Sequence, residues 1–578
     1  MERPSSTWFV LCCFALFFSL ASVTSFVQKS PVIDEPMHLF AGYTYLKWGD
    51  FRSNPEHPPL AKMWAALPLL SSDLPDVRQP PHWDFMPYEP LGVSLVDCVY
   101  RFFFANGGSE ALFFRARLQM IFIGILLGTF IYILAKKLFG LTAAVAALAL
   151  YALDPNILAH TAIIHTDIPF AASFFIGTYF FSRSLSSFSA TNIACSAASF
   201  AIAAITKYSA IAILPIWGVA AVAWIFLPAW SENGAAADSR ATRLVRAAAV
   251  LSIAVVAAYV CIWAVYGFRF NAMANSAEHL DITRVLPPDS VVLRNFSGLI
   301  LDHHLLPEAW LYGQLLVFNS LQRPTYLLGW ISPTGFLSYF PVVFLVKTPI
   351  PTLVLIAVAI VLAIRRINRP QLASLMIPAL LYFAVAALAR INIGVRHLLP
   401  IYPFVFVVAG SAAAALWSGA RWMRRSAAVL GLWALWACIS SYPHYLAYFN
   451  ELVGGPRNGY RVLLDSNLDW GQDLKGLKRW MDENGVKKIQ FAYFGWTDPE
   501  YYGIDAAYIG GPWVGYNPPA TQTAEPFQYA AVSAQLLYGP DSASWRAADF
   551  RSQNPVAVIG HSIFVFKLSE NSKIPGNR

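Results

Sequence analysis

The sequence predicts a polytopic α-helical membrane protein with about eleven transmembrane helices and a C-terminal soluble α/β domain. Of its 578 residues, 57% are hydrophobic and only 13% are charged, whereas a soluble protein carries about 25% charged residues. The apolar residues gather in long blocks, and the basic residues gather in short clusters between those blocks. These observations are typical of a chain that crosses a bilayer many times.

Each predicted span is an apolar block of about 20 residues, the length that crosses the hydrocarbon core as a helix. The blocks are 8–27, 117–139, 141–160, 168–184, 190–206, 208–229, 247–266, 337–364, 372–390, 397–418 and 426–443. The first block follows Arg3, as the core of a signal peptide would, but its apolar run exceeds the usual length of about 7–15 residues. We therefore interpret it as a retained anchor.

The distribution of basic residues predicts the orientation of the chain. Four clusters lie between spans, and they comprise Lys136/Lys137, Arg240/Arg243/Arg246, Arg365/Arg366/Arg369 and Arg421/Arg424/Arg425. With the N-terminus in the cytoplasm, all four clusters fall inside, as the positive-inside rule expects. We predict a multi-pass protein of the inner (plasma) membrane. The net charge of +8 therefore indicates membrane orientation, and no nucleic-acid partner is expected.

This orientation divides the chain into two predicted domains. Residues 1–443 form a transmembrane domain with outer loops at 28–116 and 267–336, and residues 444–578 form an extracytoplasmic α/β domain. In the second domain the pattern predicts a strand at 460–464, a helix at 472–484, a strand at 488–494 and a hairpin of 556–559 with 563–568.

Acidic residues occur where the chain leaves the membrane on the outer side. Asp34 and Glu35 directly follow the first span, and His57 and Lys62 lie in a proline-rich stretch further on. Asp167 lies in the turn between the third and fourth spans, where capping of the next helix is a sufficient explanation on its own. The functional interpretation is that Asp167 supplies a second carboxylate on the same side of the membrane as Asp34.

Basic residues lie at the same predicted membrane surface. Lys207 stands between two apolar blocks, Lys347 stands within a long one, and Arg396-His397 flank an outer turn. Cations at such depth are costly and usually have a partner, although snorkelling to the interface explains Lys207 equally well. Together these residues indicate an electropositive pocket whose natural ligand is a phosphate.

Acids and cations gathered at the outer membrane surface suit a lipid phosphate that carries a group to be transferred. A carboxylate takes the proton from an acceptor hydroxyl. Cations stabilise the phosphate as it departs with its charge.

The order of these motifs resembles the GT-C superfamily of membrane glycosyltransferases, closest to its branch of protein O-mannosyltransferases and lipid A aminoarabinose transferases. Asp34-Glu35 resembles the acidic pair of that family's first outer loop, and His57-Pro58-Pro59-Leu60-Ala61-Lys62 resembles its Pro-Pro-Leu element. Asp167 resembles the second acidic position, and Lys207 the lysine after the fifth span, although Tyr208 replaces the glycine that often follows. The stretch from Arg396 to Pro403 resembles a late motif near the lipid phosphate.

The resemblance implies a sugar on a polyprenyl phosphate as donor, an acceptor hydroxyl on a protein, lipid or glycan, and inversion at the anomeric carbon. Asp34 is then the general base, while Glu35 and Asp167 position the donor, the acceptor or a cation. The residues predicted to bind the lipid phosphate or donor are Lys207, Arg396, His397, His57, Lys62 and Lys347. A divalent cation, Mg²⁺ or Mn²⁺, stays open, and no other cofactor is indicated.

The predicted outer domain carries its own acidic motif. Asp465, Asp469 and Asp473 recur every four residues in a stretch that resembles a bacterial subgroup of family 39-type transferases. They either line an acceptor groove, bind a cation, or cap the following helix and the turn before it, and capping is the simplest interpretation.

Two other functions fit the same composition. A polytopic secondary transporter also has many spans and buried charges, but the sequence shows no duplicated halves. A non-catalytic membrane scaffold with a partner-binding outer domain would depend more on the Asp465–Asp473 segment than on Asp34.

Overall fold

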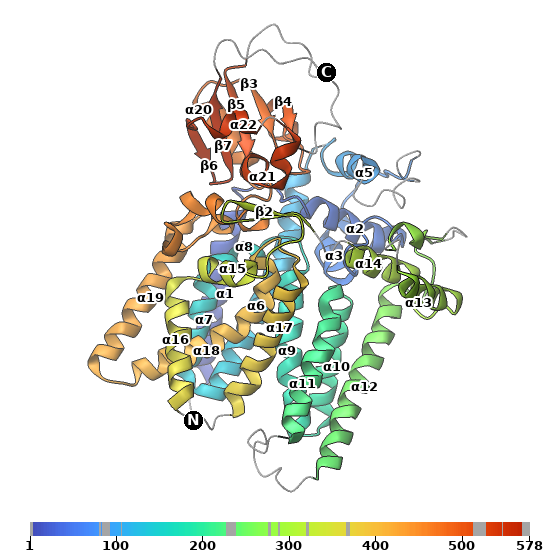
Figure 1. Ribbon diagram of the computed structural model, residues 1–578, viewed down its shortest axis with the longest axis vertical. Coiled ribbons are helices and arrows are strands. Elements are labelled where there is room, and N and C mark those ends of the chain that lie inside the picture. The colour runs from blue at the N-terminus through green and yellow to red at the C-terminus, as the bar shows by residue number, and fades with distance from the viewer. Residues whose placement is uncertain are drawn as a thin grey trace.

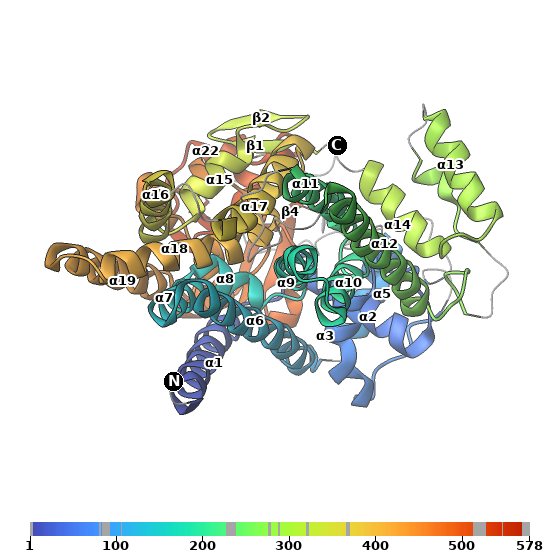
Figure 2. The same cartoon turned by 90° about the horizontal axis from the view of Figure 1, so that it is seen from below.

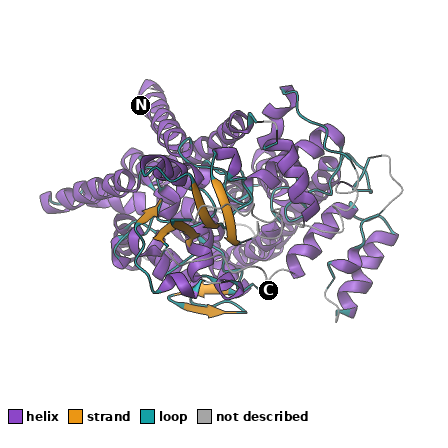
Figure 3. Cartoon of the chain, turned by 90° about the horizontal axis from the view of Figure 1, so that it is seen from above, coloured by secondary structure: helices purple, strands orange, loops and turns teal. Residues whose placement is uncertain are grey.

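The computed structural model shows a bundle of long helices with a small β-sheet domain at one end, and the N-terminus lies at the opposite end (Figure 1). It describes residues 4–79, 83, 93–105, 107–226, 239–274, 279–286, 290–319, 323–365, 370–511, 527–545 and 547–568. Seen from above, the strands of the sheet lie over the helical bundle (Figure 3). The predicted combination of an apolar helical bundle with a C-terminal α/β region is therefore observed.

The helices follow one another with short connections through most of the chain. The N-terminal ones are α1 Pro4–Phe26, α2 Glu35–Trp48, α3 Leu60–Ala66, α5 Val93–Phe103, α6 Ser109–Phe139, α7 Leu141–Leu153, α8 Pro155–Thr161, α9 Asp167–Ser186, α10 Ala190–Ala204, α11 Ile213–Phe226 and α12 Arg240–Val265. The remaining ones are α13 Val291–Asp302, α14 Glu308–Asn319, α15 Tyr339–Lys347, α16 Ile350–Arg365, α17 Pro370–Ala389, α18 Tyr402–Trp417, α19 Arg421–Ser441, α20 Leu474–Glu483, α21 Ala534–Tyr538 and α22 Ala548–Arg551. A short antiparallel hairpin, β1 Thr325–Leu327 with β2 Trp330–Ser332, lies between α14 and α15.

Five helical segments of the described chain are long and apolar enough to cross a membrane, and up to seven spans result if each of two bent pairs counts as one. The five are Thr7–Phe26, Ser109–Phe139, Tyr208–Phe226, Arg240–Val265 and Val395–Trp417. The bent pairs are α7 with α8, at 65°, and α15 with α16, at 110°. The predicted spans at 190–206 and 372–390 coincide with shorter apolar helices, Ala190–Ala204 and Leu375–Ala389. The protein is thus a multi-pass helical membrane protein, while the count of eleven spans stays a prediction.

Proline marks both bends. Pro155 opens α8, and the Asp154 carboxylate accepts hydrogen bonds from the backbone N–H groups of Asn156 and Ile157, at 2.9 and 3.2 Å. Pro349 separates α15 from α16. Proline lacks a backbone N–H and excludes the preceding residue from helical geometry, so each apolar block breaks there.

The basic ends of the helices are consistent with the predicted orientation. Lys136 and Lys137 occupy the last turn of α6, and Arg240 and Arg243 open α12. α12 begins at the end of the bundle that lies away from the sheet, where the N-terminus also lies (Figure 1). Of the other predicted basic residues, Arg3, Arg366 and Arg369 lie outside the described residues.

Burial within the bundle differs from helix to helix. The most apolar 18-residue window of Val395–Trp417 has 78% of its residues buried, against 22% for that of α12. Viewed from below, α1 and α19 lie at the periphery of the bundle (Figure 2). An apolar helix surface that faces outward is the surface a bilayer covers.

The C-terminal region forms a mixed five-stranded sheet in the order β4-β3-β5-β7-β6. Its strands are β3 Lys488–Ala492, β4 Asp505–Gly510, β5 Tyr529–Ser533, β6 Ala557–Ile559 and β7 Ile563–Lys567. β3 is parallel to β4 and β5, whereas β7 is antiparallel to β5 and β6. α20 buries Leu474, Leu477 and Met481 in the same apolar cluster as Phe491 of β3.

The predicted helix at 472–484, the strand at 488–494 and the hairpin are confirmed. The strand predicted at 460–464 is wrong, because Pro456–Arg461 forms a 3-10 helix. A short apolar run fits several buried conformations equally well, so its periodicity alone does not select a strand.

Asp469 links this sheet to the loop before α20. It is fully buried, and its carboxylate accepts hydrogen bonds from the backbone N–H groups of Gly471, at 3.3 Å, and Gln535, at 3.1 Å. Burial raises the pKa of Asp469 to about 7. Because the folded state favours the protonated form, its stabilising contribution is full below about pH 4 and is lost as the pH rises through 7.

We therefore expect the thermal stability of Asp469→Asn to depend less on pH than that of the wild type. The asparagine side chain keeps the shape but has no proton to lose between pH 5 and pH 8. Unfolding temperatures of both proteins in detergent, measured across that range, test this. Identical slopes for the two proteins would contradict the burial-driven shift.

Candidate active site

The two acidic residues after α1 lie in different surroundings. Asp34 immediately precedes α2 and its side chain is 27% exposed, whereas the Glu35 side chain is fully buried. Neighbours in sequence at a helix start point in different directions. The sequence pair Asp34-Glu35 is therefore two separate sites in the fold.

Protein donors occupy the Glu35 carboxylate. Arg117 of α6 donates two hydrogen bonds to it, at 2.8 and 2.6 Å. The backbone N–H groups of Val32 and Ile164 donate to it as well, at 2.8 and 3.2 Å. Glu35 therefore ties the first outer loop to α6 and to the turn before α9, which disagrees with the predicted catalytic contact with substrate.

Removal of Arg117 should strongly destabilise the fold. Arg117→Met leaves the Glu35 charge buried without its partner, which costs about 3–5 kcal/mol of unfolding free energy. Arg115→Met on the same helix is the matched control. Arg115 donates hydrogen bonds to the Ala111 and Pro68 carbonyls and to the Ser72 hydroxyl at the partly exposed surface, so its loss should cost about 1 kcal/mol or less. Thermal or denaturant unfolding in detergent measures both, and equal losses would contradict the role of the pair.

Asp34 pairs with Arg396, far along the chain. The Arg396 Nη1 donates to Asp34 Oδ2 at 2.9 Å. Arg396 lies in the 3-10 helix Val395–Ile401, just before α18, and its side chain is 11% exposed. The preceding Gly394 has φ of +152°, and a Cβ there would lie 2.2 Å from the Ser466 Oγ, so only glycine fits this approach.

Asp167 pairs with Lys207 in the same part of the molecule. The Lys207 Nζ donates to Asp167 Oδ1, and both side chains are more than 90% buried. Asp167 makes no capping hydrogen bond, because Thr166 is the residue before α9 and its side chain makes none either. The capping interpretation is therefore wrong, and Asp167 serves as an ion-pair partner. Lys207 does not snorkel, because its side chain is buried. Its backbone is extended and lies between α10 and the 3-10 helix Tyr208–Ala212.

Histidines lie beside the Asp167–Lys207 pair. The His165 Nδ1 lies 3.1 Å from Asp167 Oδ2 and 2.9 Å from the Asp167 backbone nitrogen. Burial lowers the pKa of His165 and of His38 to about 4, although nearby carboxylates oppose the shift. Both imidazoles are therefore neutral at pH 7. A neutral His165 accepts from the Asp167 N–H at Nδ1 and donates through Nε2 to His160, 3.3 Å away.

His57 lies next to these groups. Its ring stands edge-on to His38 with the centroids 5.7 Å apart. Its buried Nδ1 has no hydrogen-bond partner among the described residues. Burial lowers the pKa of His57, and Lys207 and His38 contribute in the same direction. His397 packs against Phe340 at 6.3 Å between centroids.

Two predicted phosphate-binding lysines are bound to the protein itself. The Lys62 Nζ donates to the Asn54 carbonyl, the Asn54 side chain and the His57 carbonyl, at 2.5 to 2.8 Å. The Lys347 Nζ donates to the carbonyls of Leu446 and Asn467, at 2.9 and 2.7 Å. Both side chains are buried. Because carbonyls take up these donors, the geometry disagrees with the predicted phosphate contacts of Lys62 and Lys347.

The C-terminal region contributes residues that sequence reasoning did not place in the site. The Trp470 ring lies 4.5 Å from the Arg396 guanidinium and 5.8 Å from the His165 ring. Asp465 has φ of +56°, and burial raises its pKa to about 6 despite the opposing charge of Arg396. Asp473 makes no cap for α20, because its carboxylate accepts from Lys29 and Ser562, at 2.5 and 2.6 Å. The capping interpretation of this acidic motif is therefore wrong for Asp473.

Within the described chain, no three His, Cys, Asp or Glu side chains are grouped as metal ligands would be. The Asp34 and Asp167 carboxylates already pair with basic side chains. The residues present do not fit a cation held by the protein, and the proposed chemistry uses none.

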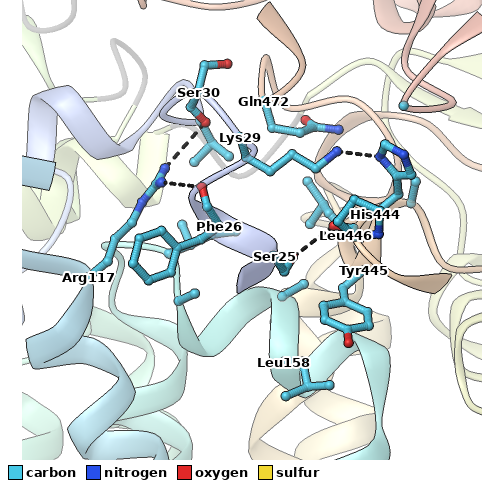
Figure 4. A pocket seen from close by; sticks show the side chains of 17 residues that line it. Ser25, Phe26, Lys29, Ser30, Arg117, Leu158, His444, Tyr445, Leu446 and Gln472 are labelled. Atoms are coloured by element: carbon cyan, nitrogen blue, oxygen red, sulfur yellow. Dashed lines mark hydrogen bonds between the residues drawn. The ribbon is translucent and has the colours of Figure 1, made fainter. Parts of the chain in front are cut away.

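One pocket lies between the end of α1, α8 and the segment after α19 (Figure 4). Its basic groups are all engaged, since Lys29 contacts His444 and Asp473, and Arg117 binds Glu35. A second pocket, of about 540 Å³, lies between the β1–β2 hairpin and the C-terminal region and is lined by Tyr326, Tyr538 and Trp545. Neither pocket is lined by Asp34, Asp167, Lys207 or Arg396.

A helical membrane bundle with acid–cation pairs at one end is consistent with the predicted class of membrane glycosyltransferase, and one family model matches part of the chain. Residues 99–263 match the model of the dolichyl-phosphate-mannose-protein mannosyltransferase family. No curated protein sequence matches the chain. The matched region covers less than a third of the chain and indicates an enzyme of the glycosyltransferase class.

Several solved structures are distantly similar to the chain. ArnT from Cupriavidus metallidurans, in the apo state, is 14% identical with a TM-score of 0.46, and the match covers 98% of each chain. The same enzyme bound to undecaprenyl phosphate has 14% identity and a TM-score of 0.44, over 99% of this chain and 100% of that one. The Archaeoglobus fulgidus oligosaccharyltransferase in the apo form is 12% identical with a TM-score of 0.44, over 93% and 70% of the two chains.

Proposed function

We propose that the protein transfers a sugar from a polyprenyl-phosphate donor to an acceptor hydroxyl on a protein, lipid or glycan. The observation that carries this proposal is the convergence of two acid–cation pairs, Asp34–Arg396 and Asp167–Lys207, at one end of the bundle. His165 accepts a hydrogen bond from the Asp167 backbone N–H, and its ring lies beside the Trp470 ring, which also contacts Arg396. The family whose model matches residues 99–263 is named for a lipid-phosphate mannose donor, which supports the same donor class.

Asp34 is the general base of the proposed reaction. It is the more exposed of the two acids and reaches solvent beside the outer loop. Its carboxylate takes the proton of the acceptor hydroxyl, whose oxygen attacks the anomeric carbon as the bond to the phosphate oxygen breaks. Attack from the face opposite the leaving group inverts that carbon.

Arg396 and Lys207 hold the phosphate that leaves on the lipid. Each of these cations is neutralised by a carboxylate. A donor phosphate shares or replaces these carboxylate contacts, and the cations stabilise the charge that develops as the bond breaks. Asp167 and His165 keep Lys207 in place, and His57 and His397 line the same region. We assign Glu35, Lys62 and Lys347 to the support of the fold.

The proposed reaction takes place on the outer side of the inner (plasma) membrane. The predicted topology puts the N-terminus in the cytoplasm and the C-terminal region outside. The acid–cation cluster lies next to that region, because Trp470 contacts Arg396.

Incubation of the purified protein with a panel of polyprenyl-phosphate sugars tests the proposal. We expect one donor to release its lipid phosphate in the presence of a hydroxyl acceptor, with a glycosylated product of inverted configuration. Solute uptake into vesicles without release of lipid phosphate from any donor would contradict it.

A further inference from the structure

The loop at residues 465–473, here called the tail loop, is bonded to the segment that carries Asp34. The backbone N–H of Ile33, next to Asp34, donates to the Trp470 carbonyl at 2.9 Å. The Ser30 N–H donates to the Gln472 carbonyl at 3.0 Å. The position of Asp34 is therefore tied to the C-terminal region by main-chain hydrogen bonds.

The same loop is bonded to the segment that carries Arg396. The Ser466 Oγ donates to the Ile393 carbonyl at 2.5 Å. The Val395 N–H, adjacent to Arg396, donates to the Asn467 side-chain oxygen at 2.9 Å. Both members of the Asp34–Arg396 pair are thus held by one loop, although they are 362 residues apart in the sequence.

Trp470 adds a side-chain contact to this connection. It is only 1% exposed, and its ring lies 4.5 Å from the guanidinium carbon of Arg396. Asp34 binds one edge of that guanidinium, and the Arg396 Nε has no hydrogen-bond partner among the described residues. A planar cation stacked on an aromatic face keeps its plane but leaves its remaining N–H groups free for an anion.

We propose that Trp470 is a positioning residue that fixes the plane of the Arg396 guanidinium for the leaving phosphate, so that the tail loop is part of the catalytic centre. This inference rests on the proposed function of Arg396. It extends that function to the C-terminal region, which would otherwise serve only to bind an acceptor. The phosphate carries its greatest charge after the bond breaks, so misplacement of Arg396 lowers kcat more than it raises KM for the donor.

Trp470→Leu in the full-length protein tests the stacking, because leucine keeps an apolar side chain but has no aromatic face. We expect kcat to fall about 10-fold with little change in KM for a polyprenyl-phosphate sugar. Trp470→Phe keeps an aromatic face and should recover most of that loss. Trp480→Leu is the matched control, since Trp480 packs on Tyr529 of the sheet and should leave kcat unchanged.

The outcomes separate this inference from the proposed function. Unchanged kcat in Trp470→Leu, alongside an inactive Arg396→Gln, would contradict the role of Trp470 alone. Failure of Trp470→Phe to recover activity, with a folded protein by thermal unfolding, would also contradict stacking as the cause. Full activity in Arg396→Gln would contradict the proposed function, and the positioning of Arg396 would then have no catalytic purpose.

Discussion

Asp34→Asn is expected to lower the rate of sugar transfer by about 10²–10⁴-fold, the range that general-base catalysis contributes. The substitution keeps the shape of the side chain and removes only its ability to take a proton. The Asp34 side chain is partly exposed, and among the described residues it pairs only with Arg396. The folded protein should therefore survive the change, and rates measured with saturating donor and acceptor check it.

The same substitution should not weaken donor binding, although it lowers the rate of transfer. Without the Asp34 charge, Arg396 loses its intramolecular partner and becomes a stronger ligand for the donor phosphate. We expect Asp34→Asn to bind a polyprenyl phosphate at least as tightly as the wild type. Asp76→Asn, an exposed acid of the same outer loop that pairs with Arg78, is the matched control and should keep its transfer rate. Wild-type transfer in Asp34→Asn would remove Asp34 from the role of base.

Lys207→Met is expected to lower kcat/KM for the donor by about 10²–10³-fold, because an oriented group that stabilises developing charge contributes on this scale. The same change leaves Asp167 buried and unpaired, which costs about 3–5 kcal/mol of stability. A loss of activity in the single variant therefore has two causes.

The double variant Asp167→Asn/Lys207→Met separates these causes. It removes both charges, so the stability lost in the single variant should return in large part. Transfer should stay low, because the phosphate still lacks its cation. Unfolding temperatures and transfer rates of the three variants provide the test. Recovery of transfer together with stability would show that Lys207 only supports the fold.

The residues at the two ion pairs could be predicted from the sequence because their chemical types stand out. Asp34, Asp167, Lys207 and Arg396 are charges next to long apolar blocks, where a charge is costly. The alternation of apolar blocks with basic clusters likewise predicted a helical membrane protein, because basic residues gather in the loops on the cytoplasmic side. Helix ends and the number of crossings depend on bends at Asp154-Pro155 and Pro349, which block lengths do not reveal.

The partners of charged residues could not be predicted, because residue type alone does not show which groups the fold brings into contact. Glu35, Lys62 and Lys347 carry the same charges as the groups at the ion pairs, but Arg117 binds Glu35 and backbone carbonyls bind the two lysines. Trp470 carries no charge, and only the fold of the tail loop places it on Arg396. The sequence pattern instead indicated its neighbours Asp465, Asp469 and Asp473, as helix caps or ligands.

The central claim is that Arg396 and Lys207 hold the phosphate of a lipid-linked donor, while Asp34 takes the proton of the acceptor. A structure of Asp34→Asn with a bound polyprenyl-phosphate sugar tests this claim most directly. We expect the phosphate within hydrogen-bond distance of Arg396 and Lys207, with the anomeric carbon facing residue 34. A phosphate bound instead in the pocket beside Lys29 and Arg117, with Arg396 and Lys207 still paired to the protein, would contradict it.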